Sequence, residues 1–225
     1  MTQVAPRRAP AAEPIPAHFP ARSRAQPRFQ HVRALLVLNA VYFGAAVLAA
    51  GYAFLNPVIQ SQVTEAAVDA FSPTGGLGPL VQAYLGGELL RAILLTFLVN
   101  LILGSLVVIT LPSAVIPFAG LLIGVYRAVL WGLLFAPTPG STMGPTLWLH
   151  MPTILLEGEA YVIAMLGVWL WWRAVITSPR QRWMAWLHDF KLQLGVYAVM
   201  TVLLAAAAVY ESIEVIWLLP LFGAA

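Results

Sequence analysis

The stretch that decides the fold is LLRAILLTFLVNLILGSLVVITL, residues 89–111, which runs for 23 residues with one charge, Arg91. A helix crosses the apolar core of a membrane with about 20 mostly apolar residues. This stretch is long enough to do so, and its few polar side chains are widely spaced. It therefore predicts one membrane-spanning helix.

The composition of the whole chain agrees with that stretch. Of the 225 residues, 60% are hydrophobic, 9% are charged and none is cysteine. A soluble domain carries about 25% charged residues, so this composition nearly excludes a water-soluble enzyme domain. The lack of cysteine excludes disulfides, thiolate metal sites and a cysteine nucleophile. We predict an integral membrane protein.

We expect an all-α integral membrane bundle of about five transmembrane helices, with short interfacial helices beside them. The expected spans cover residues 34–55, 89–111, 114–135, 147–172 and 192–219. Only Leu111-Pro112-Ser113 separates the second span from the third, which predicts a tight helical hairpin. The membrane domain then occupies residues 34–219, and residues 220–225 form a short outer tail.

The first 33 residues differ from the rest, with six arginines, six prolines and one acid. Such a segment cannot bury enough apolar surface to fold. We expect a basic cytoplasmic tail attracted to anionic lipid head groups, with no role in nucleic-acid binding. With this tail inside, ten of the twelve basic residues lie on the inner side, as the positive-inside rule requires. The expected location is a bacterial plasma membrane, with the C-terminus outside.

Two further stretches predict interfacial helices. Ser178-Pro179 is typical of a helix start, and apolar residues follow it at i, i+3, i+4 and i+7. These expected membrane-interface residues are Trp183, Trp186, Leu187 and Phe190. We expect them to lie on the inner leaflet. On the outer side, residues 57–71 have a weaker amphipathic pattern.

Small residues recur along the third expected span, at Gly120, Gly124, Ala128 and Gly132. This four-residue spacing makes a smooth ridge on one helix face and allows another helix to approach closely. The span is therefore expected to pack between helices, of this chain or of a partner.

Ionisable and polar residues within the spans are the candidate site, because lipid-facing charges are costly. The cluster consists of Arg127, Glu157, Glu159, Glu211, Glu214, His150, Thr153 and Asn100. An isolated arginine at this depth costs at least ~2.5 kcal/mol, so Arg127 should have an acidic partner. We predict Glu157 as the first choice and Glu211 as the second. His150, Thr153 and Glu157 share one helix face, whereas Glu159 points about 160° away from Glu157.

This cluster allows two interpretations. It can be a structural network that fixes the helices or docks a partner, or it can line a path for protons or a substrate. The chain contains no H-E-x-x-H, G-x-S-x-G or P-loop motif, and only His150 lies near the carboxylates. We therefore expect no catalytic residues, no metal and no cofactor.

Four segments follow one another in a recognisable order. They are Phe97-Leu98-Val99-Asn100, Gly120-Leu121-Leu122-Ile123-Gly124, residues 152–160 with Glu157, and the alanine run at 205–208 followed by Glu211 or Glu214. With these segments, residues 90–219 resemble the stage II sporulation protein M family of prokaryotic multi-span proteins. Thr153 and Ile154 stand where that family has histidine and glycine.

The resemblance implies a membrane fold and a non-catalytic scaffold or accessory subunit of a larger membrane complex. Its partners would be the lipid bilayer and other membrane protein subunits. The alternative is a transporter or permease subunit in which the Arg/Glu cluster lines a proton or substrate path. A water-accessible path to the cluster would favour transport, whereas a dry cluster with every acid paired would favour the scaffold.

Overall fold

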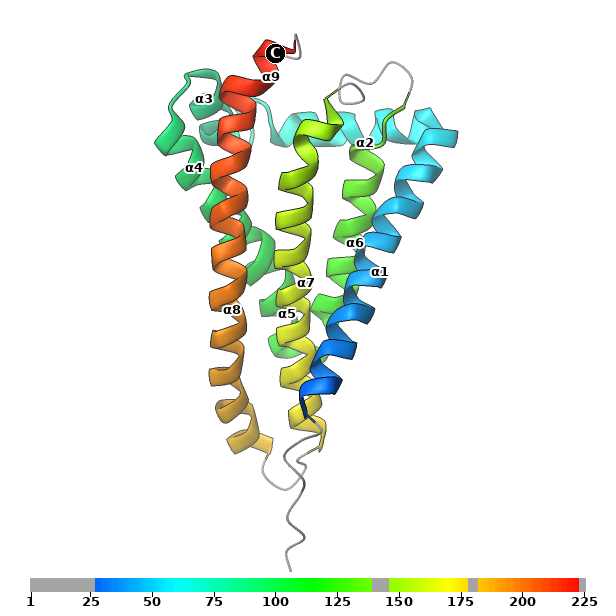
Figure 1. Cartoon of the computed structure of the whole chain (residues 1–225), viewed down its shortest axis with the longest axis vertical. Helices are drawn as coiled ribbons and strands as arrows, with labels where there is room; N and C mark the ends of the chain where they lie inside the picture. Colours follow the sequence, from blue (N-terminus) through cyan, green and yellow to red (C-terminus); the bar gives the residue numbers. More distant parts are fainter. Residues whose placement is uncertain (1–26, 139–145, 178–181, 223–225) are drawn as a thin grey trace, which may run out of the picture.

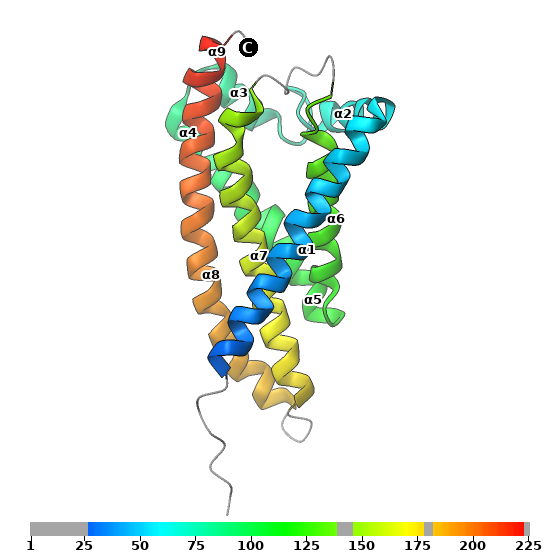
Figure 2. The ribbon, with the colours of Figure 1, turned by 45° about the vertical axis from the view of Figure 1, so that its right-hand side comes forward.

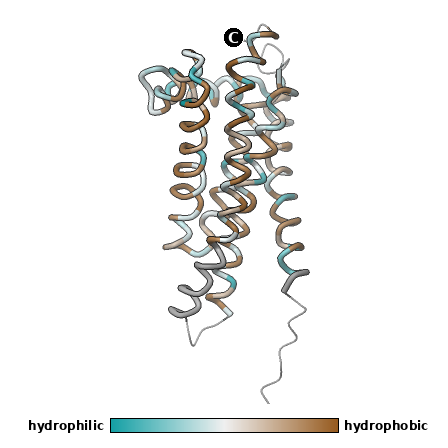
Figure 3. Tube along the Cα trace, turned by 60° about the vertical axis from the view of Figure 1, so that its left-hand side comes forward, coloured by the Kyte–Doolittle hydropathy of each residue, from teal (hydrophilic) through white to brown (hydrophobic). Residues whose placement is uncertain are grey.

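The computed structural model describes residues 27–138, 146–177 and 182–222, and all regular structure in these ranges is helical (Figure 1). Four helices are long and apolar enough to cross a membrane, and they cover Gln30–Leu55, Leu89–Val115, Leu147–Thr177 and Leu194–Leu221. Apolar residues predominate along the long helices (Figure 3). The predicted all-helical architecture is confirmed for the described residues, and four of the helices could cross a membrane, as expected.

Helix α1 covers Pro27–Leu55 and begins before the expected start at residue 34. The last residues of the expected tail are therefore helical, and residues 1–26 lie outside the described ranges. Figure 2 shows α1 running obliquely across the bundle. Its inner face packs against α6 (Ala119–Leu134) and α7 (Leu147–Thr177).

Two short helices follow at the end of the bundle where α1 finishes. Helix α2 covers Pro57–Ala70, as the amphipathic pattern predicted, and lies across the long helices (Figure 1). Its buried Gln60 donates hydrogen bonds to the carbonyl oxygens of Leu134, at 3.1 Å, and Ala136, at 2.6 Å. Carbonyls at a helix C-terminus have no partner within the helix, so α2 caps the end of α6. Helix α3 covers Gly78–Leu85.

The second span is longer than predicted. It consists of α4 (Leu89–Leu98), the π-helical segment η1 (Val99–Thr110) and α5 (Leu111–Val115). The expected break at Leu111-Pro112-Ser113 is wrong, because Pro112 lies in the first turn of α5, where its missing N–H costs least.

The turn after this span lies at Ile116-Pro117-Phe118 instead. Ile116 is extended, as a residue before proline prefers, and Phe118 has a positive φ of 61°. The Ser113 hydroxyl donates to the carbonyl of Ile109 at 2.8 Å and accepts from the N–H of Gly120 at 2.7 Å. This hydroxyl therefore joins the helices on the two sides of the turn.

The third expected span is shorter than predicted. Helix α6 covers Ala119–Leu134, and its 16 residues measure about 24 Å, less than the ~30 Å of bilayer hydrocarbon. It runs beside α1 and α7 (Figure 1). The described structure therefore contains four long candidate spans and one shorter apolar helix.

Helix α7 (Leu147–Thr177) is the central element, and six of the eleven buried residues that form the main core belong to it. It packs most extensively against α8, which covers Arg182–Ile213 and continues through η3 (Glu214–Leu218) into α9 (Leu219–Leu221). The start of α1 and the end of α9 lie at opposite ends of the bundle (Figure 1).

The expected interfacial helix after residue 178 is not a separate element. Its four apolar residues, Trp183, Trp186, Leu187 and Phe190, fall within α8, whose backbone is continuous from Arg182 to Ile213. This segment and the fifth expected span are thus one helix. The side chains of residues 182–193, like Ser178-Pro179, lie outside the described part of the chain. In the expected outer tail, Pro220 and Leu221 belong to α9.

Candidate functional site

The middle of α7 carries the buried Glu157, whose side chain faces η1. Asn100 of η1 donates its amide hydrogen to the Glu157 carboxylate. The hydroxyl of Tyr161, one turn further along α7, donates to the amide oxygen of Asn100 at 2.8 Å. Asn100 is 7% exposed and Glu157 5% exposed, so these hydrogen bonds lie inside the bundle. They join the second span to α7.

Arg127 of α6 reaches this cluster through Tyr161. Its Nη2 donates to the Tyr161 hydroxyl at 2.8 Å, and its guanidinium lies 4.3 Å from the centre of the same ring. A second ring, that of Trp131, has its centre 5.5 Å from the guanidinium. Aromatic faces stabilise a desolvated guanidinium by about 2 kcal/mol.

The predicted ion pair between Arg127 and Glu157 is wrong for the described structure, and so is the second choice, Glu211. Arg127 is connected to Glu157 by way of Tyr161 and Asn100, because the Tyr161 side chain takes the hydrogen-bonding position beside the guanidinium. The Nε atom of Arg127 is buried and has no hydrogen-bond partner among the described residues. Aromatic side chains thus replace the expected carboxylate.

Helix α8 carries a further carboxyl group, that of Glu211, which is half-buried and close enough to Glu157 and Tyr84 to interact with them electrostatically. Tyr84 belongs to α3, and its hydroxyl also lies 2.6 Å from the hydroxyl of Thr96 in α4. Burial raises the pKa of the Tyr84 phenol. The contact between Tyr84 and Thr96 joins α3 to α4.

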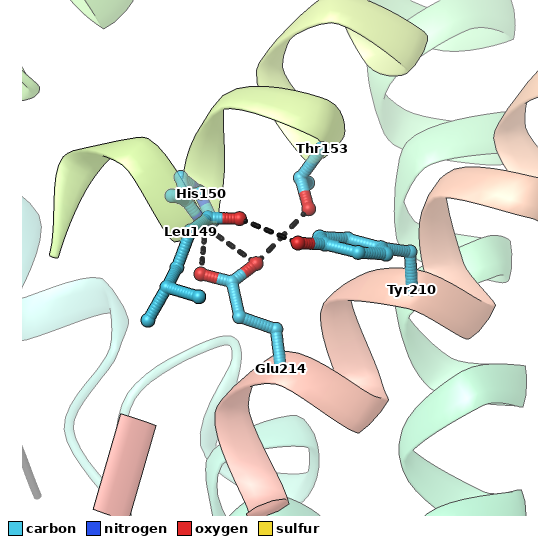
Figure 4. Close-up of polar contacts among 5 residues, drawn as sticks. All are labelled: Leu149, His150, Thr153, Tyr210 and Glu214. Carbon is cyan, nitrogen blue, oxygen red and sulfur yellow. Dashed lines mark hydrogen bonds and ion pairs between the residues drawn. The ribbon is translucent and has the colours of Figure 1, made fainter. Parts of the chain in front are cut away.

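A second group of polar contacts joins α7 to the end of α8 (Figure 4). Glu214 is fully buried, and its two carboxylate oxygens lie 3.0 and 3.2 Å from Nδ1 of His150. The Thr153 hydroxyl donates to Glu214 at 3.2 Å, and the Tyr210 hydroxyl donates to the Leu149 carbonyl at 2.8 Å. These contacts fix the register of the two helices.

Glu159 lies in a different environment from Glu157, as its position on the helix predicted. It is half-buried and accepts a hydrogen bond from Asn39 of α1 at 3.4 Å. Glu159 therefore ties α7 to α1, on the other side of the helix from the Asn100 contact.

A small cavity of about 30 Å³ lies between α1, α6 and α7. Its lining includes Tyr42, Trp131, His150, Thr153, Glu157 and Tyr161. This volume is enough for roughly one or two water molecules. His150, Thr153 and Glu157 thus face the same space, as their i, i+3, i+7 spacing predicted.

The four small residues of α6, Gly120, Gly124, Ala128 and Gly132, are all buried. The structure places this ridge against other helices of the same chain. A side chain at Gly120 would meet the carbonyl of Ile109, one at Gly124 would meet Met165, and one at Gly132 would meet Ala46. The ridge therefore lets α6 approach η1, α7 and α1.

Sequence reasoning missed several residues of this site, among them Trp131, Tyr161, Tyr84 and Asn39. Tyr161 had a usable signal, because it lies four residues after Glu157 and so on the same helix face. Asn39 had one too, because it is a polar residue within the first expected span, whereas Tyr84 lies outside the expected spans. No three His, Asp or Glu side chains within residues 27–138, 146–177 and 194–222 gather as metal ligands do.

No family model, curated protein or solved structure matches the chain.

Proposed function

We propose that the protein is a non-catalytic membrane scaffold or accessory subunit of a larger membrane complex, similar to stage II sporulation protein M. One observation carries the proposal: three in-span carboxylates each have a hydrogen-bond partner on another element. The pairs are Glu157 with Asn100, Glu159 with Asn39, and Glu214 with His150. A cluster paired in this way holds helices together and leaves little free space for a substrate.

The placement of the four resembling segments supports the same proposal. Asn100, from the first segment, donates to Glu157 of the third, and Thr153 of the third donates to Glu214 of the last. The glycine pair of the second segment packs on Ile109 and Met165. These segments thus contribute to one interior, and their shared role is to set the arrangement of the helices.

The test compares Glu157→Gln with the wild type after native purification in a mild detergent. Glutamine replaces one acceptor oxygen by an amide donor, and a buried donor left unsatisfied costs about 1–3 kcal/mol, so the variant should lose co-purifying membrane subunits. Glu88→Gln is the matched control, since Glu88 is 50% exposed and pairs with Arg91 at 3.0 Å outside the cluster. The control should retain every subunit that the wild type binds.

The alternative is a transporter or permease subunit, and the small cavity beside Glu157 favours it. This cavity extends to His150, so two ionisable side chains within the spans face one space, as in a path for protons. Proton flux in reconstituted vesicles that is lost in Glu157→Gln, with subunit assembly intact, would replace the scaffold proposal by this one.

The proposal places the N-terminus in the cytoplasm and the C-terminus outside a bacterial plasma membrane. Because the chain has no cysteine, single cysteines report topology without background. A cysteine at Thr177 should react with a membrane-impermeant maleimide only after the cells are opened, and one at Phe222 should react in intact cells. The reverse pattern contradicts the proposed orientation.

A further inference from the structure

A second cavity is lined by residues from the first turns of α1 and the last turns of α7. These two segments lie together at the end of the bundle opposite α2 and α3 (Figure 1). It is an open groove of about 470 Å³. Its lining includes Gln30, Arg33, Val37, Leu38, Trp169 and Arg173. None of the contacts described above uses this groove.

The polar part of the groove is cationic. Arg33 and Arg173 come from different helices and line the same space, and no acidic residue is among the described lining. The Arg173 guanidinium lies 4.9 Å from the Trp169 ring centre and donates to the side chain of Gln30. A guanidinium has five N–H donors, so these contacts use only part of its capacity. Two arginines in one groove favour a phosphate.

The remaining wall of the groove is apolar and belongs to one face of α1. Ala34, Val37 and Leu38 follow one another at i, i+3 and i+4, and Val37 is 53% exposed. Gln30 is the first residue of the candidate span Gln30–Leu55. The cationic part of the groove therefore lies at the membrane boundary, and the apolar wall leads into the hydrocarbon.

We propose that this groove binds one acidic glycerophospholipid, with its phosphate between Arg33 and Arg173 and an acyl chain along Val37 and Leu38. Charge complementarity selects this occupant, because an acidic lipid adds a net negative charge to a groove with two cations. A zwitterionic lipid carries a compensating cation, and inorganic phosphate has no chain to cover the apolar wall. This binding does not depend on the function proposed for the carboxylate cluster.

The experiment measures the thermal unfolding midpoint of the whole chain in dodecyl maltoside with added phosphatidylglycerol or phosphatidylcholine. A ligand that binds only the folded state raises this midpoint in a concentration-dependent way. Phosphatidylglycerol should raise the wild-type midpoint more than phosphatidylcholine does. The double variant Arg33→Gln/Arg173→Gln should lose this difference between the two lipids. It should need at least about ten times more phosphatidylglycerol than the wild type to reach the same midpoint.

Two variants control for general effects of charge and folding. Arg91→Gln removes an arginine from the first turn of α4, and it should keep the full response to phosphatidylglycerol. Helix α4 follows α3 at the end of the bundle opposite the start of α1 (Figure 1). Arg33→Gln alone changes an exposed residue, so it tests the groove even if the double variant does not fold. It should weaken the response to phosphatidylglycerol partly.

Four results would overturn the inference. They are equal midpoint shifts with the two lipids, an equal shift with inorganic phosphate, an unchanged lipid preference in the double variant, and loss of that preference in Arg91→Gln. A change from dimer to monomer in the double variant, without any lipid preference in the wild type, would instead identify a second copy of the chain as the occupant.

Discussion

Replacing Gly132 by alanine tests how closely α6 and α1 approach each other. The added Cβ would lie 2.9 Å from the carbonyl carbon of Ala46 and 2.9 Å from Cβ of Ala49, and closer still to the Ala46 carbonyl oxygen. Carbon atoms in ordinary contact lie about 3.5–4.0 Å apart. The two helices must therefore separate by at least about 0.6 Å at this point, the difference between 3.5 and 2.9 Å.

The expected loss of stability follows from what obstructs the new methyl group. Overpacking a filled interior costs about 1–3 kcal/mol, and the upper half applies here because backbone atoms of Ala46 cannot rotate away. Alanine also favours the helix by about 1 kcal/mol relative to glycine, which offsets part of the loss. The free energy of unfolding should fall by about 1–2 kcal/mol, a factor of about 5–30 in the folded-to-unfolded ratio.

The measurement is reversible unfolding in mixed micelles of dodecyl maltoside and sodium dodecyl sulfate, followed by tryptophan fluorescence. Trp131 adjoins the substituted position and stacks on Phe135 with 4.9 Å between ring centres, so it reports on this region. Gly44→Ala on α1 is the matched control, because a Cβ there meets nothing within 4 Å. It should leave stability unchanged or raise it slightly.

A third variant tests whether obstruction by a side chain costs less stability than obstruction by the backbone. Gly124→Ala meets the sulfur of Met165, a flexible side chain that can move aside, so it should cost less than Gly132→Ala. If Gly132→Ala costs no more than Gly44→Ala, the close approach of α6 to α1 is refuted. If Gly124→Ala costs more than Gly132→Ala, the distinction between backbone and side-chain obstruction fails.

Three further predictions use the same unfolding titration. Asn100→Ala removes the hydrogen-bond donor to the buried Glu157 carboxylate and should lower the free energy of unfolding by about 1–3 kcal/mol. A change near zero would mean that this hydrogen bond does not contribute to stability. Ser113→Ala removes two hydrogen bonds at the turn before α6 and should cost about 1 kcal/mol, with faster hydrogen exchange at the Gly120 amide; unchanged exchange there would contradict the Ser113 contact. Burial raises the pKa of Tyr84, so the folded state holds this proton more tightly than the unfolded state. The free energy of unfolding should then fall as the pH rises above about 10, and Tyr84→Phe should reduce this fall; equal slopes in variant and wild type would rule out the effect.

Residues 89–115 and α7 show how much of the fold is predictable from composition and length. A helix satisfies its backbone hydrogen bonds within itself, so a long apolar segment in lipid has few alternatives to being helical. The hairpin turn was harder to place, because two prolines, Pro112 and Pro117, compete as breakers. Pro112 is accommodated in the first turn of α5, and Pro117 makes the turn.

In the candidate site too, one part was predictable from the sequence and another part was not. Membership of the cluster was predictable, because a polar residue within an apolar span is conspicuous and must face other protein. Pairing was not predictable, since the expected Arg127–Glu157 contact is replaced by a path through Tyr161 and Asn100. Depth along the membrane follows from residue number, but the rotation of each helix about its axis does not.

The sequence by itself determined an all-helical chain with helices long and apolar enough to cross a membrane, whose few in-span charges form a candidate site. Only the tertiary structure decided that Asn100 donates to Glu157, and that Arg33 and Arg173 line one groove. The physical reason is the range of the interactions. Helix formation depends on neighbouring residues and the surrounding lipid, whereas helix rotation and pairing depend on the sum of contacts between segments far apart in the chain.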